Sequence, residues 1–185
     1  MTQTYHPVFV WITTHFNFLA PLILATWMAW GDVRQRRIPN YLTLGTALAG
    51  LGYQLATQGL AGLGQGFLGL GLGFFLMLPF YLKGGMGAGD VKALAALGAW
   101  LGPLETLYLF VYMGLAGLPL IIFHLWQKGT LGVRLRQFWA YLLNLFLLHS
   151  HPPGPKTTRV PNRSEGLPYA VAMALGMGLL FFRFS

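Results

Sequence analysis

The stretch that decides the fold is residues 8–30, VFVWITTHFNFLAPLILATWMAW, which contains no Lys, Arg, Asp or Glu. A helix of about 20 apolar residues crosses the hydrocarbon core of a bilayer, so this run predicts a membrane-spanning helix. The run lacks the basic start and the small-residue cleavage site of a secretory signal peptide. We therefore expect it to be a retained span.

The composition of the whole chain indicates a membrane protein. Hydrophobic residues make up 55% of the 185 residues and charged residues 9%, whereas a soluble domain carries about 25% charged residues. The pattern predicts an all-α integral membrane protein with about six transmembrane helices, in a single domain over residues 1–185. The further apolar segments that complete this count are 39–58, 61–82, 91–101, 104–126 and 167–182.

The charged residues predict the topology. The net charge is +8, and the basic residues lie in short segments between apolar runs, which is typical of loops retained on the cytoplasmic side and not of a nucleic-acid-binding protein. We expect cytoplasmic loops at about 31–40, 83–90 and 127–166, contacts with membrane lipids, and no nucleic-acid partner. In this topology Arg183 is the one Lys or Arg residue on the non-cytoplasmic side of the membrane. The absence of cysteine excludes disulfides, thiol nucleophiles and cysteine-ligated zinc.

Three segments need a separate interpretation. The helix 91–101 either continues kinked through Pro103 or begins with Asp90 below the membrane surface. Segment 138–148 is interpreted as an interfacial or partly embedded helix, because a crossing would leave the basic residues after it outside. A stripe of glycines at three- and four-residue spacing within 61–82 predicts close helix packing. Its members are Gly62, Gly66, Gly69 and Gly73.

The sequence contains two aspartates, Asp32 and Asp90, both at predicted cytoplasmic ends of spans. Two carboxyls that meet at one membrane face repel each other, so one stays protonated, and the pair can activate water and protonate a leaving amine. The structural alternative is that Asp90 caps a helix beginning at Val91 and that Asp32 pairs with a nearby arginine such as Arg34. Each aspartate alone fits the structural role, and the pair points to catalysis.

Three segments carry a family resemblance. Residues 87–92, GAGDVK, with the following ALAALGAWLG, are similar to the signature of the prepilin peptidases, the type IV leader peptidases. Residues 32–40, DVRQRRIPN, resemble the other signature of that family, and residues 167–172, LPYAVA, resemble its proline-tyrosine stretch. The three matches occur in the order of the family and together extend from residue 32 to residue 172.

The resemblance implies an aspartyl protease architecture of the GxGD type in a single transmembrane peptidase domain. It implies that Asp32 and Asp90 are catalytic, that the active site faces the cytoplasm at the inner membrane, and that no metal or other cofactor is used. The substrates implied are prepilin or pseudopilin proteins, cleaved between a short basic leader and a hydrophobic helix. The implied supporting residues are Gly87 and Gly89, which would let the loop move Asp90 toward Asp32, with Lys92, Pro39, Asn40, Pro168 and Tyr169.

This chain departs from the longer members of the family because it has no cysteines for a zinc domain. We therefore expect the short six-span form and regard N-methyltransferase activity as doubtful. The alternative class is a non-enzymatic membrane component of a pilus or type II-like secretion assembly, in which both aspartates are structural. A proton-coupled transporter is a third class, and the lack of an internal repeat argues against it.

Overall fold

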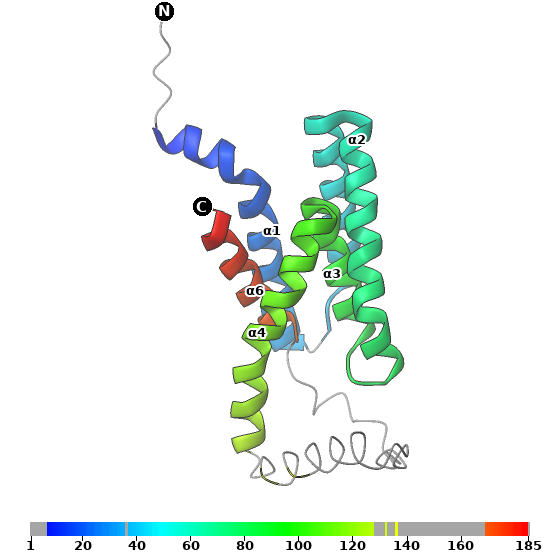
Figure 1. Ribbon diagram of the computed structural model, residues 1–185, viewed down its shortest axis with the longest axis vertical. Helices are drawn as coiled ribbons and strands as arrows, with labels where there is room; N and C mark the ends of the chain where they lie inside the picture. The colour runs from blue at the N-terminus through cyan, green and yellow to red at the C-terminus, as the bar shows by residue number, and fades with distance from the viewer. Residues whose placement is uncertain (1–6, 36, 128–131, 133–135, 137–168, 185) are drawn as a thin grey trace, which may run out of the picture. The chain divides into compact units, whose positions relative to one another are not determined.

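The computed structural model describes residues 7–35, 37–127, 132, 136 and 169–184, which form helices and, over these residues, no strand. The expected all-α class is therefore confirmed for the described part of the chain. The predicted segment 138–148 and Pro168 lie outside it. In chain order the helices are α1 (Pro7–Gln35), α2 (Asn40–Leu82), α3 (Ala88–Leu101), α4 (Pro103–Gln127) and α6 (Tyr169–Phe184) (Figure 1).

Helix α1 is longer than the sequence predicts. The expected span 8–30 with a loop from Asp32 is wrong at its C-terminal end, because the helix continues to Gln35. Nothing in residues 31–35 forces a stop, and Arg34 in the last turn favours the negative end of the helix dipole. The Arg34 guanidinium lies over the Trp30 ring, 5.4 Å from its centroid. Asp32 is consequently held on a helix and not on a loop.

Helix α2 is a hairpin of two helical segments. Gly59 has φ 65° and ψ −149°, a backbone conformation that glycine adopts readily and other residues avoid. The predicted break between 58 and 61 is confirmed at this residue, and Figure 1 shows the two segments side by side. A Cβ on Gly62 would contact the carbonyl oxygen of Gln54, so the two segments approach to backbone contact.

Helix α3 forms the core and is buried from Asp90 to Leu101 except at Lys92. The close packing that the sequence predicts for the glycine stripe of α2 is confirmed, and Gly66, Gly69 and Gly73 of that stripe face α3. A Cβ on Gly69 would contact the carbonyl oxygen of Gly98, and one on Gly73 would lie 2.8 Å from the carbonyl oxygen of Leu94. Absence of side chains on this face of α2 therefore lets the two backbones touch.

The break after α3 is sharp. Helix α3 ends at Leu101, Gly102 has φ 80°, and α4 begins at Pro103. The alternative of one kinked helix through Pro103 is therefore wrong. The reason is local, because Gly102 takes a left-handed conformation and proline has no amide hydrogen to continue the ladder.

Helix α6 packs against α1 and α4. Helices α1 and α6 contact each other directly. A Cβ on Gly176 would lie 2.7 Å from the backbone nitrogen of Met113 in α4. At its C-terminal end Arg183 donates a hydrogen bond to the Tyr112 hydroxyl at 3.0 Å, and its guanidinium lies 4.4 Å from the Tyr108 ring centroid. These contacts hold the middle and the C-terminal end of α6 against α4.

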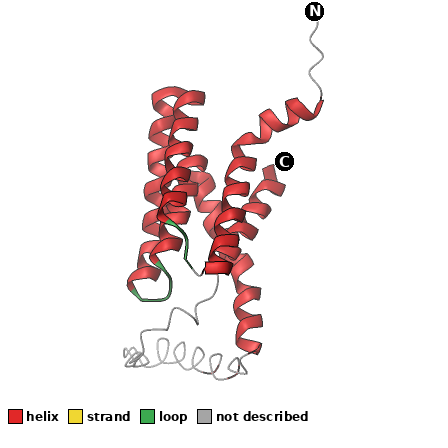
Figure 2. Ribbon diagram, turned by 180° about the vertical axis from the view of Figure 1, so that it is seen from behind, coloured by secondary structure: helices red, strands yellow, loops and turns green. Residues whose placement is uncertain are grey.

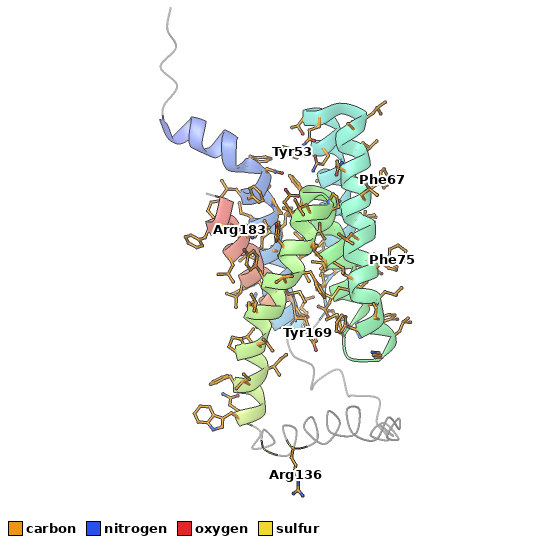
Figure 3. The ribbon with its side chains drawn as sticks, viewed as in Figure 1. Tyr53, Phe67, Phe75, Arg136, Tyr169 and Arg183 are labelled. Carbon is orange, nitrogen blue, oxygen red and sulfur yellow. The ribbon has the colours of Figure 1, made fainter. Side chains whose placement is uncertain are left out.

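Among the described residues, two helices are long and apolar enough to cross a membrane, Asn40–Leu82 and Pro103–Phe123. The apolar helix Tyr169–Arg183 is shorter. Large side chains such as Phe67 and Phe75 point away from the helices (Figure 3) and are 55% and 67% exposed. The six-span count remains a prediction. The chain forms two compact units, and the site described below lies within the first, Met1–Gly117 with Pro168–Ser185.

Candidate active site

Two of the sequence motifs meet at one end of the helices. Figure 2 shows the loops before α2 and before α3 at the same end. A Cβ on Gly89 would lie 3.4 Å from Cβ of Ile38, whose side chain is buried. Lys92 Nζ donates a hydrogen bond to Asn40 Oδ1 at 3.0 Å. The segments 32–40 and 87–92, far apart in sequence, are therefore in contact.

The start of α3 positions Asp90. The expectation that Asp90 caps a helix beginning at Val91 is wrong, because α3 begins at Ala88 with Gly87 as its N-cap. Asp90 is the third helical residue, and its Oδ2 accepts a hydrogen bond from the Gly87 backbone N–H at 3.2 Å. Residues 88 and 89 adopt helical geometry without a side-chain cap, and the carboxylate reaches back to the cap residue as in a capping box. A Cβ on Gly87 would lie 3.3 Å from Asp90 Oδ2, so glycine permits this approach.

The Asp90 carboxyl lies outside both helices that are long enough to span a membrane, and it is 8% exposed. Burial, and to a smaller extent the charge of Asp32, raise the pKa of Asp90 from 3.8 to about 6 against the opposing effect of the hydrogen bond from Gly87. Asp32 on α1 is half-buried. The two carboxyls that the sequence pairs are thus close enough to repel each other without a movement of the loop.

A third helix contributes to this environment. Tyr169, the first residue of α6, lies close enough to Asp90 to interact with it electrostatically, and Figure 3 shows its position. Pro39 lies at the other side of the site as the N-cap of α2, with φ −63° and ψ 136°. Its carbonyl oxygen accepts hydrogen bonds from the backbone N–H groups of Leu42 and Thr43. Pro39 therefore has a structural role at the start of α2.

Sequence analysis does not single out the residues that hold the far end of α3. Trp100 Nε1 donates to the carbonyl oxygen of Thr46 at 2.8 Å, and Gln54 Nε2 donates to the carbonyl oxygen of Trp100 at 2.7 Å. Both contacts are buried and join α2 to α3. The polar Gln54 within an apolar run was the available signal. Over the described ranges, no group of three His, Asp or Glu residues could hold a metal ion.

The chemistry that this site can perform depends on the two carboxyls of Asp32 and Asp90. A carboxyl with a pKa raised to about 6 near a second carboxyl can share one proton with it at mildly acidic pH, because the charge of one carboxylate opposes ionisation of the other. Such a pair supplies a general base and a general acid at one place. Because the pair titrates as a unit, its two apparent pKa values belong to both residues.

Comparison with known proteins gives a family match over this region. The chain matches the type IV leader peptidase family over residues 19–122. It is also 36% identical over 104 residues to a protein named "Prepilin leader peptidase/N-methyltransferase" from Xanthomonas campestris pv. campestris. That alignment covers 53% of this chain and 36% of the relative, so the chain spans well under two thirds of the relative's length. No solved structure matches the chain.

Proposed function

The chain belongs to the type IV leader peptidase family, and on that premise we propose that it is a membrane-embedded aspartyl endopeptidase that removes the basic leader from prepilin-like proteins. The observation that carries the proposal is the position of Asp90, buried in front of Asp32 at the point where segments 32–40 and 87–92 touch. The printed name of the Xanthomonas relative, with its reference to prepilin leaders, supports the same substrate class.

In the proposed reaction the ionised carboxyl of the dyad takes a proton from a water molecule, and the oxygen of that water attacks the scissile carbonyl. The protonated carboxyl then gives its proton to the leaving amine, so the pair ends the cycle with one proton, as it began. Burial and the charge of Asp32 raise the pKa of Asp90 to about 6, so a fraction of the carboxyl stays protonated near neutral pH, as the acid step requires. Because the two carboxyls titrate as one coupled pair, neither the role of base nor the role of acid is assigned to Asp32 or Asp90 alone.

We place the active site at the cytoplasmic face of the inner membrane, because the basic residues concentrate in the loops on the same side as both aspartates. The substrate is a prepilin or pseudopilin whose leader ends where a hydrophobic helix begins. The proposal is limited to hydrolysis. The relative's name also includes N-methyltransferase, and the carboxyl pair accounts for the peptidase reaction alone.

The test is cleavage of candidate prepilins by purified protein, with sequencing of the product N-termini. Asp32→Asn and Asp90→Asn should each abolish cleavage, because Asn keeps the size and hydrogen-bonding capacity of Asp but cannot ionise. The double variant should be no worse than either single variant, as expected for groups that act as one unit. The matched control is Glu105→Gln, since Glu105 lies in the first turn of α4, at the opposite end of α3 from Asp90.

A near wild-type rate in either Asn variant would remove the dyad from the mechanism. It would favour the non-enzymatic component of a pilus or secretion assembly, in which both aspartates have structural roles. If the wild-type protein, tested in a bilayer, cleaves the leader from none of the prepilins, the peptidase assignment itself is wrong.

A further inference from the structure

Lys92 has an unusual place in α3. It is the one exposed residue between Asp90 and Leu101, and every other side chain in that stretch is buried. Its Nζ donates a hydrogen bond to Asn40 Oδ1 at 3.0 Å, which links the fifth residue of α3 to the first residue of α2. A hydrogen bond from a charged donor is stronger than a neutral one, but an exposed contact of this kind contributes only about 0–1 kcal/mol to stability. The contact therefore contributes little to overall stability, and any larger consequence must be local to the start of α3.

The geometry separates Lys92 from the carboxyl of Asp90. Residues two apart on an α-helix project about 200° from each other around the axis, so Lys92 reaches Asn40 from a different side of α3 than Asp90 faces. The influences on Asp90 are burial, Asp32 and the Gly87 N–H, and the ammonium of Lys92 is not one of them. The contact of Lys92 is with Asn40, so its route to Asp90 is the position of the helix that carries both residues.

Asn40 is a fixed point for this contact. Its carbonyl oxygen accepts a hydrogen bond from Thr43 Oγ1 at 3.0 Å, and the preceding Pro39 has a ring-restricted φ of −63°. Next to it, Ile38 fills the space beside Gly89. Residues 38–40 thus offer one apolar and one polar contact to the N-terminal part of α3.

From these contacts we propose that the Lys92–Asn40 hydrogen bond is a positioning contact that holds the first turn of α3 against the start of α2 and thereby fixes Asp90 in front of Asp32. The inference rests on the proposed peptidase function for its catalytic consequence and on geometry alone for its structural one. Loss of the contact lets the N-terminal turn of α3 move away from α1. A displacement of about 1 Å between reacting groups can lower a rate about 100-fold.

The structural consequence can be measured without activity. The chain contains only two aspartates, so protein labelled with ¹³C at the aspartate carboxyl gives two NMR resonances to titrate in detergent. The groups of other helices that face Asp90 are Asp32 on α1 and Tyr169 on α6. Asn40→Ala changes no charge, and we expect it to lower the higher apparent pKa of the dyad by about one pH unit as the carboxyls separate and gain solvent.

Lys92→Met should shift the titration in the same direction, and Lys92→Arg should leave it unchanged because it keeps a charged donor for Asn40. The matched control is Lys83→Met, which removes an exposed lysine just after α2 without touching the contact. A role in stability alone would lower the amount of folded protein and leave the titration where it is. An unchanged titration in Asn40→Ala, or a shift confined to Lys92→Met, would overturn the proposal.

The catalytic consequence is tested by kinetics with a cleaved prepilin. Asn40→Ala and Lys92→Met should each lower kcat by about 10- to 100-fold with little change in KM, and the double variant should be no worse than either alone. Additive losses in the double variant would overturn the proposal by showing that the two residues act independently. If the titration shifts as expected while the wild type cleaves no prepilin, the positioning contact stands and the proposed peptidase function fails.

Discussion

The replacement Asp90→Asn should make the protein more stable at neutral pH while it removes activity. In the folded protein burial and the charge of Asp32 raise the pKa of Asp90 from 3.8 to about 6. The ionised carboxylate is therefore less favourable in the fold than in the unfolded chain. One pKa unit corresponds to about 1.4 kcal/mol, so the fold carries a cost of about 3 kcal/mol once Asp90 is ionised. Asn has no charge to bury and avoids that cost.

The sign of the pH dependence follows from proton binding. Between pH 3.8 and about 6 the folded state holds the Asp90 proton and the unfolded state has lost it, so the free energy of unfolding falls as the pH rises through this window. Below the window both states are protonated and the Asn variant has no advantage. Above it the difference is constant at about 3 kcal/mol. For a chain of this size that corresponds to a Tm about 6–12 °C higher.

The assay is thermal unfolding in detergent at pH 3.5 and pH 8, followed by tryptophan fluorescence of the wild type, Asp90→Asn and Glu105→Gln. Asp90→Asn should unfold at a higher temperature than the wild type at pH 8 and at the same temperature at pH 3.5. Glu105→Gln should follow the wild type at pH 8. An Asn variant that unfolds at or below the wild-type temperature at pH 8 would refute the claim that Asp90 is buried at an energetic cost.

Two further predictions concern the scaffold. Gly69→Ala should lower the free energy of unfolding by about 2–4 kcal/mol, because a Cβ there would contact the carbonyl oxygen of Gly98. The control is Gly71→Ala on the same helix, where a Cβ would have nothing within 4 Å, so this change should be neutral or slightly stabilising. Both are measured by the same unfolding assay. A Cβ at position 89 would lie 3.4 Å from Cβ of Ile38, so Ile38→Cys with Gly89→Cys should form a disulfide on oxidation, seen as a mobility shift on a non-reducing gel. The oxidised and reduced forms should cleave prepilin at equal rates, because the carboxyls are already together; activity recovered only with dithiothreitol would show that the loop must move.

The helices were predictable because their signal is local. A charge-free apolar run defines α1, and the break of α2 at Gly59 follows from a short polar interruption between two such runs. The glycine stripe of α2 predicted close packing without naming the partner. The motifs predicted which aspartates belong together, since a family resemblance carries three-dimensional information that composition does not contain.

The rest depends on contacts between distant residues. The hydrogen bond between Lys92 and Asn40 joins positions 52 apart, and that between Trp100 and Thr46 joins positions 54 apart. No periodicity in the sequence encodes such a pairing. The error at Asp90 was of a different kind, because an aspartate before an apolar run fits both the N-cap and the third helical position. In the structure Gly87 has the extended backbone of an N-cap residue, so Asp90 takes the third helical position.

The energetics of the dyad explain why α3 is held at both ends. The charge of half-buried Asp32 opposes a charge on buried Asp90, and ionising Asp90 costs the fold about 3 kcal/mol. A helix free to slide or tilt would relieve that repulsion by moving Asp90 toward solvent. At the far end the buried hydrogen bonds of Trp100 with Thr46 and Gln54 oppose sliding, and at the near end the contact of Lys92 with Asn40 opposes tilting. The backbone contact of Gly69 with Gly98 leaves no room for movement between the two ends. The packing of α3 therefore holds Asp90 where the charge of Asp32 acts on it, and this is the arrangement that the proposed sharing of a proton between the two carboxyls requires.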